Sequence, residues 1–97
     1  MKIQILDRAA SDLTDGFHFY EVQQPGLGDY FLSSLYSDIE SLQLYAGIHR
    51  KAYKEYHRLL SNRFPFAVFY MVSDNTVFIY AVVDCRRDES WIKTKLK

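Results

Sequence analysis

The chain has 97 residues and a formal net charge of zero, from 12 basic and 12 acidic side chains, and 48% of its residues are hydrophobic. This length allows one domain with a single core, and the composition excludes a disordered chain, because disorder requires low hydrophobicity and high net charge. A zero net charge also argues against strong non-specific affinity for nucleic acid. We therefore expect one globular domain over residues 1–97.

The charges are unevenly distributed along the chain. Residues 1–49 carry two basic and seven acidic side chains, whereas residues 50–97 carry ten basic and five acidic ones. An asymmetry of this kind indicates a basic binding face set against an acidic one.

Cysteine content and hydropathy predict the location of the protein. Cys85 is the only cysteine, so no internal disulfide can form, a cysteine-based metal site lacks ligands, and a reducing compartment fits best. The first ten residues hold too short an apolar run for a signal peptide, and neither apolar run near the C-terminus reaches the roughly 20 residues of a membrane span. We expect a cytoplasmic protein without a metal or cofactor.

The first half of the chain predicts a short strand and two helices. Residues 2–6 alternate apolar and polar side chains, as a strand does. Apolar residues at spacings of three and four then mark one helix before Pro25 and a second that ends near Gly47: Ala9, Leu13, Phe17 and Tyr20 in the first, and Phe31 or Leu32, Leu35, Ile39 and Leu42 in the second. Gly16 within the first helix predicts a closely packed neighbour.

From Tyr53 onward the apolar period changes from 3.6 to 2. Residues 53–61, 66–72 and 76–83 predict three strands in a meander, with Asp74 and Asn75 in a tight turn between the last two. Residues 89–96 predict one or two helical turns or an extended tail. The order is β-α-α-β-β-β, a two-layer α+β domain in which a helical hairpin covers one face of a curved antiparallel sheet that the first strand joins.

This order and three motifs resemble the RelE/ParE superfamily, the toxins of bacterial type II toxin–antitoxin pairs. The motifs are PGLGDYF at residues 25–31, RFPF at 63–66 and VVDCRRDESW at 82–91, and the resemblance covers almost the whole chain. It implies a protein of a plasmid-stabilisation type that inhibits growth when free and is neutralised by a cognate antitoxin. RelE-like members cleave mRNA in the ribosomal A site, whereas ParE-like members poison DNA gyrase.

The candidate residues depend on which of these mechanisms applies. Cleavage of RNA needs a proton acceptor, a cation for the phosphate and an acid for the leaving oxygen. The candidates for a nuclease are Lys54, Glu55, Arg58, Arg63 and Arg87, with His57 as a second proton acceptor. Where many RelE-like relatives carry histidine, this sequence has Asp84, which is a poor acid near neutrality at an ordinary pKa of about 4. His57 has a structural interpretation that we favour over a catalytic one.

The missing histidine and the zero net charge favour the ParE-like branch, which acts by binding a protein, with DNA gyrase as the expected target. The candidate target-binding residues are Arg63, Arg86, Arg87 and Trp91. Arginines bind carboxylate or phosphate bidentately, and antiparallel neighbours return the two ends of the last hairpin to the same edge of the sheet. Other interpretations stay open: Lys54 and Arg58 could protect a strand edge, Arg63 or Arg87 could bridge Asp84 or Asp88, and Trp91 could pack on the sheet.

The expected partners follow from the same resemblance. An antitoxin of this class commonly wraps its toxin with a helix and an extended segment, for which the predicted fold offers a helical-hairpin groove and a sheet edge. The sequence leaves a homodimer open and indicates no membrane partner.

Overall fold

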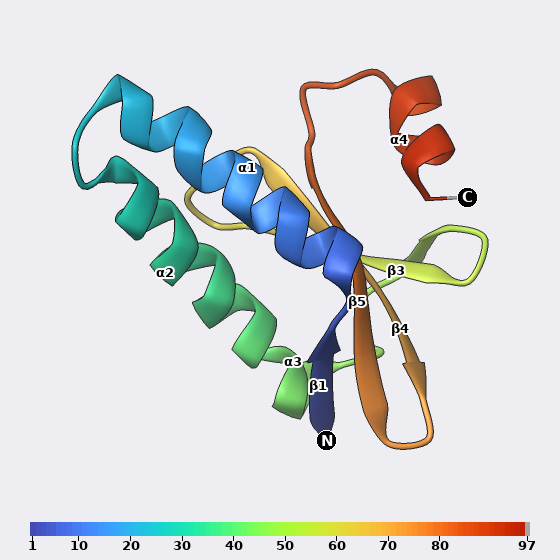
Figure 1. Ribbon diagram of the computed structural model, residues 1–97. Helices are drawn as coiled ribbons and strands as arrows, with labels where there is room; N and C mark the ends of the chain where they lie inside the picture. The colour runs from blue at the N-terminus through green and yellow to red at the C-terminus, as the bar shows by residue number, and fades with distance from the viewer. Residues whose placement is uncertain (97) are drawn as a thin grey trace.

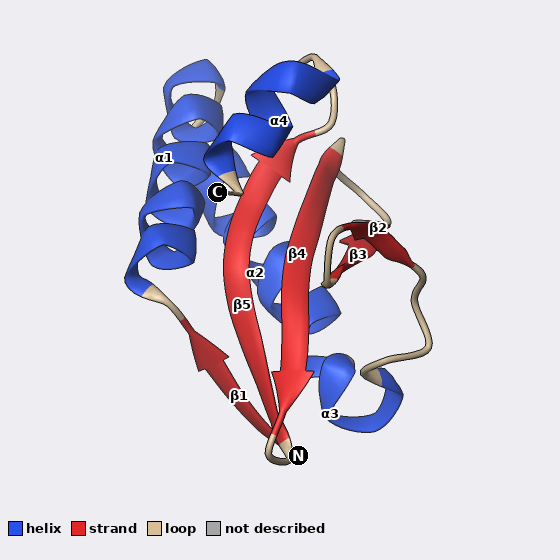
Figure 2. Ribbon diagram, turned by 90° about the vertical axis from the view of Figure 1, so that its right-hand side faces the viewer, coloured by secondary structure: helices blue, strands red, loops and turns tan. Residues whose placement is uncertain are grey.

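The computed structural model describes residues 1–96 as a five-stranded sheet with helices on both faces (Figures 1 and 2). In chain order the elements are β1 (Lys2–Ile5), α1 (Asp7–Gln23), α2 (Leu27–Glu40), α3 (Leu42–Tyr45), β2 (Lys51–Tyr53), β3 (Tyr56–Leu60), β4 (Phe66–Ser73), β5 (Thr76–Asp84) and α4 (Glu89–Lys95). None of the helices in this part of the chain is long and apolar enough to cross a membrane.

The sheet has the strand order β1-β5-β4-β3-β2. Strands β2 to β5 form antiparallel pairs, as predicted, and the turn between β4 and β5 places Asp74 and Asn75 at positive φ of 50° and 58°. Strand β1 runs parallel to β5, with Lys2 opposite Thr76, so the prediction of a wholly antiparallel sheet is wrong at this edge. Parallel pairing requires a long crossover connection, which the helices and the intervening strands supply.

The predicted strand over residues 53–61 is in fact a hairpin. Strand β2 ends at Tyr53 and β3 begins at Tyr56, and Lys54 lies in the turn between them with φ of 51°. A non-glycine residue rarely adopts this conformation, so no sequence signal marks the turn. Lys54 therefore does not share a strand with Arg58, contrary to the prediction.

The core lies on both faces of the sheet. Helices α1 and α2 cover one face (Figure 1). The buried members of that cluster are Ala9, Leu13, Tyr20, Phe31, Leu35, Ile39, Leu42, Phe66, Val68, Tyr70, Val77, Ile79 and Val82. Helix α4 packs on the opposite face, where Leu96 is buried and its carbonyl accepts a hydrogen bond of 2.9 Å from the hydroxyl of Tyr56. Burial of Leu96 and this bond fasten the end of α4 to the sheet.

Gly16 on α1 packs directly against the Phe31 ring of α2. A Cβ atom at this position would lie 2.5 Å from two ring carbons of Phe31, which is itself fully buried. The predicted close neighbour of Gly16 is therefore confirmed. We expect Gly16→Ala to lower the free energy of unfolding by up to about 2 kcal/mol, because overpacking costs about 1–3 kcal/mol and the gain in helix propensity offsets roughly 1 kcal/mol of it.

Urea unfolding of the parent chain and of Gly16→Ala measures this difference in stability. Ser11→Ala, on the exposed side of α1, is the control and should change stability by no more than about 0.5 kcal/mol. A Gly16→Ala protein as stable as the parent would show that Phe31 moves aside without cost.

Candidate functional site

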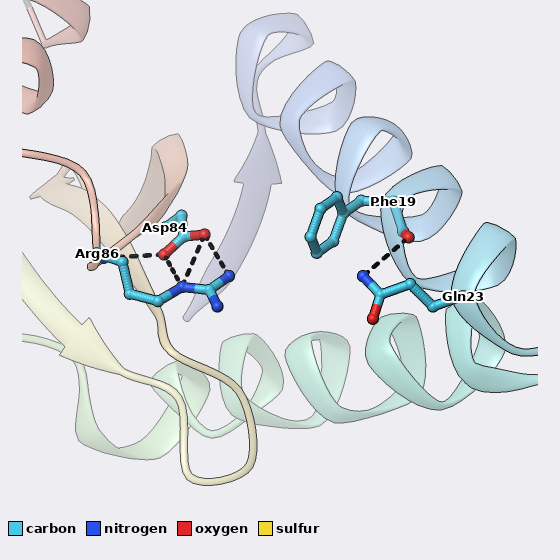
Figure 3. A network of polar contacts seen from close by, with 4 residues as sticks. All are labelled: Phe19, Gln23, Asp84 and Arg86. Atoms are coloured by element: carbon cyan, nitrogen blue, oxygen red, sulfur yellow. Dashed lines mark hydrogen bonds and ion pairs between the residues drawn. The ribbon is translucent and has the colours of Figure 1, made fainter.

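Asp84 holds Arg86 at the end of β5 (Figure 3). Nε and Nη2 of Arg86 donate to the two carboxylate oxygens over 2.9 and 2.6 Å, and the backbone N–H of Arg86 donates to Oδ1 over 2.8 Å. These bonds lower the pKa of the Asp84 carboxyl, so Asp84 stays ionised near neutrality. The Arg86 side chain remains 60% exposed, but its fork already has a carboxylate partner within the fold.

Arg63 lies in the loop between β3 and β4, and its side chain contacts Tyr30 of α2. Its Nη1 donates to the hydroxyl of Tyr30 over 2.8 Å, and its guanidinium carbon lies 5.8 Å from the centre of that ring. Phe66 pairs with Asp84, so the two ends of the hairpin do meet at one edge. Arg63 and Arg86 nevertheless have different bonding partners, and the hairpin does not by itself gather the arginines into one cluster.

Arg87 stacks on Trp91 at the start of α4. The guanidinium carbon lies 4.7 Å from the centre of the indole, and Nζ of Lys95 lies 5.5 Å from the same centre. Asp88 caps the helix by accepting a 2.8 Å hydrogen bond from the backbone N–H of Trp91. Trp91 is 38% exposed and is not among the described residues packed against the core on either face of the sheet.

Arg87 and Arg58 both line a hollow of about 260 Å³ between α4 and the β2–β3 hairpin, which we call the arginine hollow. Its lining also includes Tyr53, Cys85 and Lys93. Within residues 1–96, neither Arg58 nor Arg87 forms an ion pair with a carboxylate. Two guanidinium groups without a carboxylate partner can bind an incoming carboxylate or phosphate bidentately.

The proposed proton acceptors lie outside the arginine hollow. Glu55 lies in the β2–β3 turn and forms a 2.6 Å ion pair with Lys51, which lowers the pKa of its carboxyl. His57 lies on the face of the sheet opposite Arg58, and its Nδ1 is 2.7 Å from the carbonyl of His49. Within the hollow, partial desolvation raises the pKa of the Cys85 thiol, although the Arg58 charge acts in the opposite direction.

His49 connects the loop before β2 to the buried Tyr70. The Tyr70 hydroxyl accepts a 3.2 Å bond from the backbone N–H of Gly47 and lies 2.7 Å from Nδ1 of His49. That hydroxyl can donate its proton only to neutral His49. Burial, and secondly the charge on His57, lower the pKa of His49.

The lowered pKa of His49 makes stability depend on pH. The folded chain binds fewer protons than the unfolded chain, whose histidines titrate near pH 6.5, so stability should fall as the pH decreases below about 6.5. We expect the thermal midpoint to decrease between pH 7.5 and pH 5.5, and His49→Gln to flatten this dependence. His18→Gln, at an exposed site on α1, should keep the full dependence. If the thermal midpoint changed equally with pH in His49→Gln and His18→Gln, His49 would not be the source of the pH dependence.

A second hollow lies on the other side of α4. It measures about 300 Å³ and lies between α1, the end of β5 and α4, and we call it the aromatic groove. Phe19 forms one wall and Trp91 the other, and they are 52% and 38% exposed. Phe19 points from α1 toward the Asp84–Arg86 pair (Figure 3). Arg87 lines this groove as well as the arginine hollow.

Sequence reasoning missed several residues of these two hollows. Tyr53 and Lys93 join the arginine hollow through the β2–β3 turn and the position of α4, neither of which has a sequence signal of its own. Asp12 joins α4 to β5, since its carboxylate accepts from Lys95 and from the backbone N–H of Val82. The burial of Asp12 could have been predicted from its spacing, because it lies three residues after Ala9 on the buried face of the helix.

Comparison with known proteins identifies the fold. No protein-family model matches the sequence, and no curated protein matches it. A chain from a solved structure described as the chromosomal ParDE TA system from P. aeruginosa matches with a TM-score of 0.79, over 87% of this chain and 95% of that chain, at 19% identity. At this identity the similarity establishes the fold. The chain has the ParE-like α+β fold, so the fold implied by its resemblance to the RelE/ParE superfamily is confirmed.

Proposed function

We propose that the chain is the toxin of a bacterial type II toxin–antitoxin pair, that it acts in the cytoplasm, and that it inhibits growth by binding DNA gyrase. A cognate antitoxin neutralises it, and plasmid stabilisation is the biological role that such a pair would serve. The three sequence motifs and the structural similarity to a chain of a ParDE system support the toxin class.

One observation supports binding over catalysis. The arginine hollow combines Arg58 and Arg87, whereas Glu55 forms its ion pair in the turn and His57 lies on the opposite face of the sheet. The hollow can therefore hold a negative group of a target. The carboxylate that lines it, Glu89, is paired with Lys93 over 3.3 Å and would have to leave this pair to accept the proton that cleavage of RNA requires. Target binding extends from this hollow to Trp91 on α4 and to the exposed parts of Arg86 and Arg63.

The alternative is a ribosome-dependent mRNA endoribonuclease of the RelE type. The same two arginines favour it, because Arg58 and Arg87 in the arginine hollow could stabilise the charge on a scissile phosphate. In this alternative Arg63 and Lys54 bind more distant phosphates, and Glu55 has to leave Lys51 to accept a proton. This rearrangement makes the nuclease the second candidate.

Induction of the chain in a bacterium that lacks the antitoxin tests both candidates. DNA synthesis and protein synthesis are followed separately over the first minutes, and supercoiling by purified gyrase is measured with the purified chain. Early loss of DNA synthesis and of supercoiling is the expected result. Early loss of translation with cleaved mRNA would support the nuclease instead. If neither process stops, the chain is not a toxin.

A further inference from the structure

We propose that the aromatic groove binds the antitoxin, and that the antitoxin segment entering it carries an apolar side chain next to a lysine or arginine. This inference rests on the proposed function, because it assigns the site and the chemistry of the neutralising partner.

The shape of the groove is suited to an apolar anchor. Two large aromatic side chains from separate elements, Phe19 and Trp91, stand more than one-third exposed on opposite walls, with Gly16 and Val82 among the lining residues between them. A volume of about 300 Å³ lies at the lower end of the range for ligand sites, which suits one or two side chains of a peptide. Val22, one turn beyond Phe19 on α1, is 86% exposed and extends the apolar surface.

The charges of the groove select a protein segment that carries a cation. Three carboxylates line it, of which Asp12 pairs with Lys95 and Asp84 pairs with Arg86. Asp15 on the α1 wall has no ion pair within residues 1–96. A lysine or arginine beside the apolar anchor would complement Asp15. A nucleic-acid phosphate beside Asp15 would meet a like charge, which disfavours association.

The arginine hollow has the opposite electrostatic character. Its charged lining residues are Arg58, Arg87, Lys93 and Glu89, and Glu89 is already paired with Lys93 over 3.3 Å. The arginine hollow is thus a surface for anions, whereas the aromatic groove combines apolar walls with the Asp15 carboxylate, which is unpaired in the described part of the chain, and α4 lies between the two.

Arg87 connects the two sites, since it lines both hollows. An antitoxin segment in the groove would lie against Arg87 and restrict the access of that side chain to the arginine hollow. The antitoxin then neutralises the toxin by occupying a side chain that the target also needs, in addition to any steric obstruction.

Co-expression with the product of the adjacent reading frame tests this assignment. The variants are Phe19→Ala and Asp15→Lys. The controls are the corresponding kinds of change outside the groove. Leu44→Ala shortens an apolar side chain at an 82% exposed residue of α3, and Glu40→Lys reverses a charge at an exposed residue of α2. All four variants should arrest growth when expressed alone, because none lies in the arginine hollow. Co-expression should rescue growth with the controls but not with Phe19→Ala.

Binding of the purified adjacent product gives a second readout. We expect its Kd to increase at least tenfold for Phe19→Ala and several-fold for Asp15→Lys, and to stay within twofold for the controls. Trp91 is the only tryptophan of the chain, so its emission should shift on binding, measured as the difference between the complex and its separate components. Thermal unfolding of Phe19→Ala checks that the variant is folded.

The outcomes separate this inference from the proposed function. If the chain arrests growth and the adjacent product rescues all variants equally, with an unchanged Kd, the antitoxin binds elsewhere and the toxin function stands. If the parent chain neither arrests growth nor binds the adjacent product, the toxin function is wrong and the assignment of the groove fails with it.

Discussion

Replacing Asp12 by alanine is expected to lower the free energy of unfolding by about 3–5 kcal/mol, the usual cost of removing one partner of a buried ion pair. Asp12 is only 7% exposed, and its carboxylate accepts from Nζ of Lys95 and, over 2.9 Å, from the backbone N–H of Val82. Strand β1 pairs with β5 only as far as Ile79, so Val82 lies beyond the end of β1. Without Asp12, a largely buried ammonium group and a buried N–H group would both lose their acceptor.

Chemical denaturation of the parent and of Asp12→Ala measures this loss. Asp15→Ala is the matched control on the same helix, and it should change stability by no more than about 0.5 kcal/mol because Asp15 is exposed. The double variant Asp12→Ala/Lys95→Met should recover part of the loss, since it removes the uncompensated charge. A loss below about 1 kcal/mol in Asp12→Ala would mean that α4 is held without this ion pair.

Replacing Arg87 by alanine is expected to abolish growth arrest while leaving the fold intact. Arg87 has no carboxylate partner within residues 1–96, and its contact with Trp91 is a surface cation–π interaction worth about 0.5–1 kcal/mol. An arginine at the centre of a binding surface commonly contributes about 2 kcal/mol or more to affinity, roughly 30-fold in Kd. The loss of function should therefore greatly exceed the loss of stability.

Growth after induction and binding to purified gyrase test this prediction together. Arg50→Ala removes an exposed arginine that lines neither hollow, and it should arrest growth like the parent. Arg87→Lys keeps the charge without the fork and should retain only part of the activity. Full growth arrest by Arg87→Ala would place the target surface away from the arginine hollow.

The sequence predicted the elements whose signal is local. The stripe from Ala9 to Tyr20 and the run from Phe66 to Val83 gave the first helix and the central hairpin, because burial on one face imposes a period that the sequence displays. The β2–β3 turn was missed because Lys54 adopts a conformation for which glycine or asparagine is the usual signal. The parallel edge was missed because the direction of β1 depends on its neighbour in the sheet.

The candidate site was predicted less completely than the fold. Arg58 and Arg87 were both candidates, but they line one hollow only because of the position of α4. Leu96, the hydroxyl of Tyr56 and the ion pair of Asp12 with Lys95 all contribute to that position. Arg86 was predicted to bind the target, and its ion pair with Asp84 was not predicted, although the two residues lie only two positions apart. Which side chains pair depends on where the folded backbone places them, and composition and residue spacing do not specify this.

The pairing of β1 with β5 has a consequence for synthesis on the ribosome. Lys2 pairs with Thr76, so the first strand to emerge has no partner until most of the chain has been translated. At roughly 5–20 residues per second, this delay lasts several seconds, during which α1 and α2 can form but the sheet cannot be completed. Arg87 and α4 follow β5 and are translated later still. A growing chain therefore cannot present the arginine hollow until its translation is almost complete.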